Sequence, residues 1–198
     1  NQNFSENILM VSVELCSLHL QTEPTRDNIL ANMIFADGAA AAYFSITNIS
    51  NKKKLAIQLA ESFLFQDSAK SMGWKIGNNG FEMMLSSDLP KIILNSAAPR
   101  AKEILVQKGI DISAIKHWAL HPGGRAILDS LQNGLELSDE QLKPSREVLR
   151  NFGNLSSVSI LFVLKNLLEN VELKKDDYLC AIAFGPGLTM ELVLFKVV

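Results

Sequence analysis

Apolar and polar residues follow two different periods along this chain, and each change of period marks the boundary of an element. Short, nearly continuous apolar runs predict strands at residues 8–14, 39–46, 55–66, 74–76, 81–85, 115–120, 178–184 and 189–197. Apolar residues at helical spacing predict helices at residues 25–34, 88–105, 124–131, 139–150 and 156–169. Polar turns are expected at residues 50–54 and 77–80. Because strands and helices alternate, we expect a layered α/β/α fold.

The first predicted strand is unusually apolar. Residues 8–13 combine five large apolar side chains with one serine. A strand of this composition is normally covered on both of its faces. We therefore expect the sequence to be part of a longer protein, in which a preceding segment helps to cover this strand.

Composition narrows the class of protein. The 198 residues are 47% hydrophobic and 20% charged, which fits a compact globular chain. The net charge of −2 gives no reason to expect a nucleic-acid partner. We expect no membrane span, because Lys165 interrupts the longest apolar candidate, and no signal peptide in the polar first residues. Cys16 and Cys180 lie in strand-like runs, which predicts buried, reduced thiols and a cytoplasmic protein.

A histidine followed by Pro-Gly-Gly marks the first candidate site. His121 ends the predicted strand at 115–120, and a predicted helix begins at Gly124. This arrangement places the imidazole at the carboxyl edge of a sheet, where α/β proteins usually bind ligands. Gly123 and Gly124 would let a substrate approach the backbone and leave free amides at a helix start. A histidine that only packs or caps remains the alternative, and we expect His117 to be a surface or structural residue.

Two further loops could meet this histidine. Asn154 precedes a very apolar helix, which Ser156 or Ser157 is expected to cap, although Gly-Asn is also ordinary turn chemistry. The run Ala183–Leu188 links the last two strands and by itself predicts only a hairpin turn. A neutral histidine and an asparagine aimed at one point would stabilise an enolate or thioester oxygen. A nucleophile is missing, because apolar burial keeps both cysteines unreactive.

Three motifs in order resemble the type III polyketide synthases, the chalcone and stilbene synthase family of the thiolase fold. They are Trp118-Ala-Leu-His-Pro-Gly-Gly-Arg-Ala-Ile-Leu, then Ser145-Arg-Glu-Val-Leu-Arg-Asn-Phe-Gly-Asn-Leu-Ser-Ser, and Ala183-Phe-Gly-Pro-Gly-Leu, preceded by Ile34-Phe-Ala-Asp-Gly-Ala-Ala-Ala. The ketoacyl synthases that initiate fatty-acid synthesis typically have His-Gln-Ala-Asn in place of His-Pro-Gly-Gly. The resemblance therefore implies a thiolase-like fold with a mixed sheet, residues 1–50 ending its N-terminal half and residues 51–198 forming the C-terminal domain.

The resemblance also implies roles for individual residues. His121 and Asn154 match the family's catalytic pair, which works with a cysteine that would lie upstream of this sequence. The other roles implied are gating for Phe35 and Met83, contact with the CoA arm for Gly123, Gly124 and Ala126, and lining of the polyketide cavity for Cys16, His19, Trp74, Ser156, Phe184, Gly185 and Pro186. The substrates would be malonyl-CoA and an acyl-CoA starter, the protein would be a homodimer, and no metal or organic cofactor is implied.

The sequence departs from the plant pattern at Ala183, where the plant motif begins with glycine, and at Trp74, where plant enzymes carry a small residue. A bulky indole would shrink the cavity, so we expect a short product or an unusual starter rather than a chalcone. We expect the 198-residue chain alone to be inactive. Two other functions stay open: a ketoacyl synthase that uses acyl-carrier protein, and a non-catalytic thiolase-fold module that binds acyl-CoA or a partner.

Overall fold

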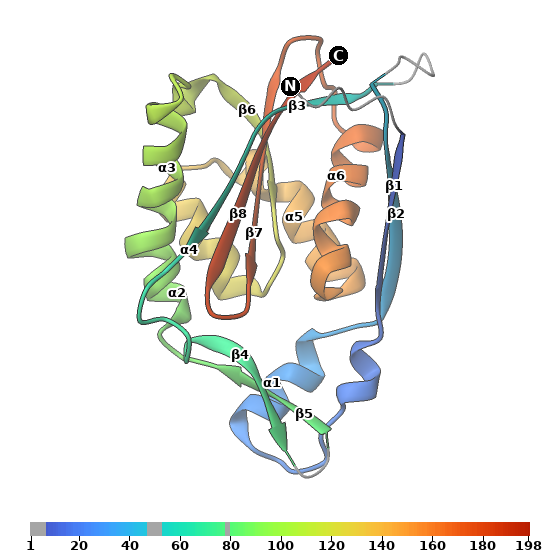
Figure 1. The fold of residues 1–198 in the computed structure, drawn as a ribbon, viewed down its shortest axis with the longest axis vertical. Coiled ribbons are helices and arrows are strands. Elements are labelled where there is room, and N and C mark those ends of the chain that lie inside the picture. The colour runs from blue at the N-terminus through green and yellow to red at the C-terminus, as the bar shows by residue number, and fades with distance from the viewer. Residues whose placement is uncertain (1–6, 47–52, 78–79) are drawn as a thin grey trace.

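The computed structural model describes residues 7–46, 53–77 and 80–198, and parts of the two predicted turns at 50–54 and 77–80 lie outside these ranges. Its elements follow the predicted alternation of strands and helices (Figure 1). In chain order they are β1 (Ile8–Glu14), η1 (Cys16–His19), α1 (Arg26–Ile34), β2 (Gly38–Phe44), β3 (Leu55–Leu64), β4 (Met72–Gly77), β5 (Gly80–Leu85), α2 (Leu89–Ile92), η2 (Ile93–Ala97), α3 (Ala98–Gln107), η3 (Ile112–Ala114), β6 (Ile115–Leu120), α4 (Arg125–Leu135), α5 (Asp139–Phe152), η4 (Ser156–Val158), α6 (Ser159–Asn170), β7 (Tyr178–Gly185) and β8 (Thr189–Val197).

A four-stranded mixed sheet forms the centre of the molecule. Its strand order is β3-β8-β7-β6, with β6 parallel to β7 and the other pairs antiparallel. The predicted hairpin of the last two strands is confirmed, with Gly185 opposite Thr189 at its turn. These strands read as nearly continuous apolar runs because helices cover both faces of the sheet.

Side chains that alternate along β6 enter two different cores. Trp118 and Leu120 are fully buried in the core beneath α2, α3 and α4, whereas Ala119 is fully buried against α5 and α6 on the opposite face. Figure 1 shows α3 and α4 on one side of the sheet and α6 on the other. The expected α/β/α layering is therefore present.

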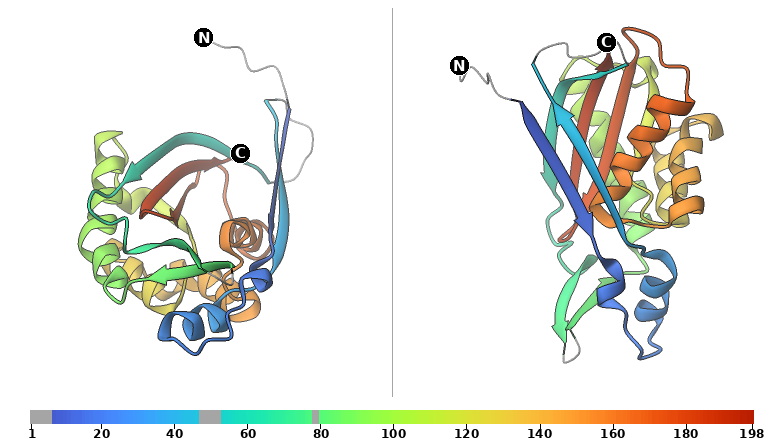
Figure 2. Two further views of the ribbon diagram at one scale, coloured as in Figure 1. Left: turned by 60° about the horizontal axis from the view of Figure 1, so that its bottom comes forward. Right: turned by 90° about the vertical axis from the view of Figure 1, so that its right-hand side faces the viewer.

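The ribbon formed by β1 and β2 lies outside α6 (Figure 2). The two strands pair antiparallel from Ile8 opposite Phe44 to Glu14 opposite Gly38. The apolar side chains of β1 are 39–64% exposed, with Leu9 at the upper limit. Within the described ranges, β1 thus lacks the cover on both faces that its composition predicts.

The hairpin of β4 and β5, the helix α1 and the short turn η1 gather at one end of the molecule (Figure 1). Thr25 caps α1 by accepting a hydrogen bond from the backbone N–H of Asn28, so the predicted helix at 25–34 is confirmed. The turn between β7 and β8 joins this end, because the N–H of Gly187 donates to the carbonyl of Met72 at 2.9 Å. No helix in the described ranges combines the length and apolar character needed to cross a membrane.

Candidate active site

His121 occupies the loop between β6 and α4, as the sequence predicts. Its backbone N–H donates to the carbonyl of Ile182 on β7 at 2.8 Å, so the strand pairing continues up to this residue. The N–H of Gly123 then donates back to the carbonyl of His121 at 2.9 Å, and α4 begins at Arg125. The strand therefore ends by placing the imidazole at the carboxyl edge of the sheet.

Asn154 is fixed by its own backbone. Its N–H donates to the carbonyl of Ile34 at 2.8 Å, and its carbonyl accepts from the N–H of Ala36 at 2.9 Å. These two bonds form an isolated parallel bridge between Asn154 and Phe35, and they join the end of α5 to the segment between α1 and β2. Asn154 is only 4% exposed, so its position in the protein is closely defined.

The side chains of His121 and Asn154 meet at Gly123. The Nδ2 group of Asn154 donates to the carbonyl of Gly123 at 3.4 Å. A Cβ atom at position 123 would lie 3.3 Å from Cδ2 and 3.6 Å from Nε2 of His121, so the imidazole packs directly against the same residue. The structure thus brings the two predicted catalytic residues together from different parts of the chain.

Burial determines the protonation state of His121. The residue is only partly exposed, and desolvation lowers the pKa of its imidazole from 6.5 to about 4. At pH 7 the ring is therefore neutral and carries one N–H, which can donate a hydrogen bond to an oxygen that gains negative charge.

The low pKa of His121 predicts a pH dependence of stability. Between pH 6.5 and pH 4 the unfolded chain binds the proton while the folded chain excludes it, so this contribution is present above pH 6.5 and is lost as the pH falls. Allowing for solvent screening, we expect a loss of about 1–2 kcal/mol by pH 5. Urea unfolding at pH 7.5 and pH 5 measures it, with His121→Gln as the variant that lacks the titrating ring. Equal losses in the two proteins would show that His121 makes no such contribution.

A hollow of about 390 Å³ lies next to this site. Five of the predicted gating and cavity residues line it: Cys16, His19, Phe35, Trp74 and Met83. Phe35 takes part in the bridge to Asn154 as well, so it connects the hollow to one of the two predicted catalytic residues. The sequence signal for all five residues was the resemblance to the family, because local patterns alone favour ordinary packing.

Aromatic rings form one wall of the hollow. Trp74 on β4 lies opposite Met83 on β5, and its ring centroid is 5.2 Å from that of His19. The ring of Phe81, which does not line the hollow itself, lies 5.6 Å from that of His19 in an edge-on arrangement. These contacts place the indole where it occupies volume that a small residue would leave free.

The turn η1, which carries Cys16 and His19, is held by Asp37. The carboxylate accepts from the backbone N–H of Ser17 at 2.7 Å and from its hydroxyl at 2.6 Å, and these bonds lower the pKa of Asp37. Asp37 was not predicted to be a site residue, although it lies within the Phe-Ala-Asp-Gly run that resembles the family. Its position between Phe35, a predicted gating residue, and the start of a predicted strand was the available signal.

The two cysteines differ from each other. Cys180 is fully buried in β7, as predicted, and burial raises the pKa of its thiol. The prediction is wrong for Cys16, which is partly exposed and lies in a 3₁₀ turn, because the chain bends away from β1 directly after Glu14. Burial and the carboxylates of Glu14 and Asp37 raise the pKa of the Cys16 thiol, so neither cysteine is an activated nucleophile.

Four predicted cavity residues do not line the hollow: Ser156, Phe184, Gly185 and Pro186. Phe184 packs partly buried against the core beneath α3 and α4. Ser156 or Ser157 was predicted to cap the following helix, and this is wrong, because α6 starts one turn later at Ser159 without a capping side chain. Ser156 instead adopts a left-handed backbone with φ of 53° and donates its N–H to Oδ1 of Asn154 at 2.9 Å.

The three residues expected to contact the CoA arm stand at the start of α4. Gly124 is the N-cap residue, and no side chain caps the helix there. The first-turn N–H groups of an α-helix have no partner within the helix, so they can bind a carbonyl or an anion. Gly123 lies directly before this position and Ala126 is in the first turn of α4.

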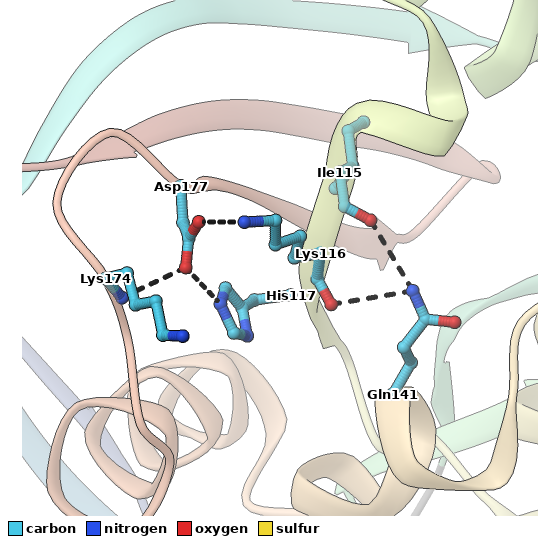
Figure 3. Close-up of polar contacts among 6 residues, drawn as sticks. All are labelled: Ile115, Lys116, His117, Gln141, Lys174 and Asp177. Carbon is cyan, nitrogen blue, oxygen red and sulfur yellow. Dashed lines mark hydrogen bonds and ion pairs between the residues drawn. The ribbon is translucent and has the colours of Figure 1, made fainter.

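His117 has a structural environment at the opposite end of β6 (Figure 3). Its Nε2 lies 3.2 Å from Oδ2 of Asp177, whose other oxygen binds Lys116 at 2.5 Å. The backbone N–H of Lys174 also donates to the Asp177 carboxylate at 3.0 Å, and these groups hold the pKa of that buried carboxyl far below its usual range. His117 therefore ties the starts of β6 and β7 together and takes no part in the site at His121.

Comparison with known proteins identifies related sequences. Residues 56–198 match the family model of the C-terminal domain of chalcone and stilbene synthases. The chain is 34% identical over 195 residues to a putative chalcone synthase of Bacillus subtilis. It is 33% identical over 194 residues to an alpha-pyrone synthesis polyketide synthase-like protein of Mycobacterium tuberculosis.

Solved structures agree with these matches. This chain superimposes on the crystal structure of PKS-I from the brown alga Ectocarpus siliculosus with a TM-score of 0.89 and 32% sequence identity. The match includes 99% of this chain and 54% of the algal chain. The 1,3,6,8-tetrahydroxynaphthalene synthase of Streptomyces coelicolor, a bacterial type III polyketide synthase, has a TM-score of 0.90 and 28% identity, covering 97% of this chain and 54% of its own. The alignments with the Bacillus and Mycobacterium relatives each include 96% of this chain. They include only 53% and 49% of those relatives, so this chain spans about half of their length.

Proposed function

Because the chain belongs to the chalcone and stilbene synthase family and carries its C-terminal domain, we propose that the full-length protein condenses malonyl-CoA decarboxylatively onto an acyl-CoA starter. The observation that carries this proposal is the meeting of His121 and Asn154 at Gly123, beside a hollow of about 390 Å³. An acyl-carrying cysteine is proposed to lie in the half of the relatives' length that this chain does not span.

The pair supplies hydrogen bonds where negative charge develops. When the malonyl carboxylate leaves as CO₂, the electron pair of the breaking C–C bond moves to the α-carbon and onto the thioester oxygen as an enolate. The neutral His121 and the Nδ2 group of Asn154 donate to that oxygen and lower the energy of this state. The enolate carbon then attacks the acyl thioester carbonyl, which forms the new C–C bond and releases the cysteine thiolate.

The partners follow from the same proposal. The CoA arm lies along Gly123, Gly124 and Ala126 at the start of α4, and the growing chain occupies the hollow beyond Phe35. We propose a cytoplasmic homodimer that needs no metal or organic cofactor besides its CoA thioester substrates.

Product analysis tests the proposed function. The full-length protein is incubated with malonyl-CoA and a panel of acyl-CoA starters, and in parallel with malonyl-acyl-carrier protein, and the products are identified by mass spectrometry. We expect pyrones or resorcinols from the CoA substrates. Products formed only from the carrier protein would indicate a fatty-acid-type ketoacyl synthase, and no CO₂ release with folded protein would indicate a non-catalytic module.

Trp74→Gly should lengthen the products by at least one malonyl extension. The indole lines the hollow beside His19, so its removal enlarges the space for the growing chain. Ile76→Gly is the matched control, because it also replaces a large apolar side chain with glycine two residues further along the same strand. The side chain of Ile76 is 85% exposed and does not line the hollow. Identical product masses from Trp74→Gly and wild type would show that Trp74 does not limit chain length.

A further inference from the structure

The side-chain amide of Asn154 receives hydrogen bonds on its oxygen from two donors. Its Oδ1 accepts from the backbone N–H of Ser156 at 2.9 Å and from the hydroxyl of Ser159 at 3.3 Å. Both contacts are possible only when the oxygen faces these groups and Nδ2 faces Gly123. The surrounding groups therefore determine which end of the amide is presented to the substrate.

We propose that Ser159 is a positioning residue, which holds the Asn154 amide with its N–H groups toward the reacting thioester. Ser159 is fully buried at the first position of α6. Its Oγ also accepts the backbone N–H of Leu155 at 2.7 Å, which leaves the single hydroxyl hydrogen to be donated to Oδ1 of Asn154. This inference rests on the proposed function, because it assigns the orientation of a residue in that site.

The other donor to the amide oxygen comes from a residue with a strained backbone. Ser156, whose N–H donates to Oδ1, has a left-handed φ of 53°, which a non-glycine residue rarely adopts. Loss of Ser159 would leave the bond from Ser156 and the long bond from Nδ2 to Gly123 to oppose rotation of the amide, and would leave the N–H of Leu155 without its partner. A rotated amide would present its oxygen to the enolate and repel it.

Kinetics of the full-length protein test the proposal. In Ser159→Ala we expect kcat for malonyl-CoA decarboxylation to fall roughly 10-fold with KM close to wild type, since the donor is misplaced but still present. Ser159→Cys should lie between wild type and Ala, because a thiol is a weaker donor than a hydroxyl. In an Asn154→Ala background Ser159→Ala should have no further effect, because the residue acts only through Asn154.

Ser138→Ala is the control for a purely structural effect. Like Ser159→Ala, it removes a serine hydroxyl that accepts a hydrogen bond from a backbone N–H, in this case the N–H of Gln141 at the start of α5. We expect it to lower stability and to leave kcat unchanged. Wild-type kcat in Ser159→Ala, or a second loss of the same size in the Asn154→Ala background, would overturn the proposal.

A measurement without turnover separates this inference from the proposed function. Neutron diffraction from deuterated crystals distinguishes ND₂ from oxygen, so it shows the amide orientation directly. We expect Nδ2 of Asn154 toward Gly123 in wild type and a rotated or mixed amide in Ser159→Ala. An unchanged amide in Ser159→Ala would refute the positioning role even if the enzyme is a synthase. If the wild-type protein has no activity and the amide still rotates in Ser159→Ala, the proposed function is refuted, although Ser159 then still sets the orientation of the amide.

Discussion

His121→Gln and Asn154→Ala should each lower malonyl-CoA decarboxylation and polyketide formation by the full-length protein by at least about 100-fold. Asn154→Ala removes one of the two donors that meet at Gly123, and His121→Gln replaces the other, a rigid imidazole N–H, with a flexible side-chain amide. Release of CO₂ and product formation are measured together, so that a lost condensation can be told from a lost decarboxylation.

His117→Gln is the matched control for this prediction. It makes the same substitution at the other end of β6, where the ring pairs with Asp177 and not with the site. We expect lower stability with retained activity in His117→Gln. Activity near the wild-type level in His121→Gln or Asn154→Ala would contradict the assigned roles.

Gly153→Ala should destabilise the protein by about 2–4 kcal/mol and abolish activity in the fraction that still folds. Gly153 has φ of 74° and ψ of −159°, a conformation that is nearly exclusive to glycine. A Cβ atom there would lie 2.8 Å from the carbonyl oxygen of Ile34, which is the acceptor for the N–H of Asn154. The substitution therefore pushes apart the two segments that position Asn154 and Phe35.

Gly109→Ala is the control for replacing a glycine of positive φ where the new Cβ atom meets no neighbour. Gly109 also has φ of 74°, but nothing lies within 4 Å of a Cβ atom at that position. We expect a loss of about 1 kcal/mol with normal activity. Chemical denaturation of both variants measures the difference, and equal losses would show that the contact with Ile34 has no role.

Much of the fold could be predicted from local sequence patterns. The strands β6, β7 and β8 and the helices α1 and α5 follow apolar periods bounded by turn and capping residues, and such patterns do not depend on distant contacts. The strand β1 was recognisable by its composition, but the pattern shows only that it needs cover and not what covers it.

The parts that the sequence did not reveal depend on contacts between distant segments. Ser156 and Ser157 look like helix caps, yet the bond from Ser156 to Asn154 displaces the helix start to Ser159. Cys16 continues an apolar run, yet the bonds from Ser17 to Asp37 form a turn there. In both cases a side chain competes successfully with regular secondary structure.

The two central residues of the site could be predicted from the sequence, but the residues that hold them in place could not. His121 and Asn154 stand in loops with clear turn residues, and their resemblance to the family pair indicated a shared site. The residues that hold them, Gly153 and Ser159, are ordinary in sequence. Their importance follows from a backbone angle and from two hydrogen bonds that only the folded chain defines.

The most direct test of the account is a crystal structure of the full-length protein with a CoA thioester bound. We predict that the thioester oxygen lies about 2.7–3.2 Å from both Nε2 of His121 and Nδ2 of Asn154, with the pantetheine arm along the start of α4. A thioester bound elsewhere, or one whose oxygen contacts neither residue, would contradict the assignment of this pair as the catalytic centre.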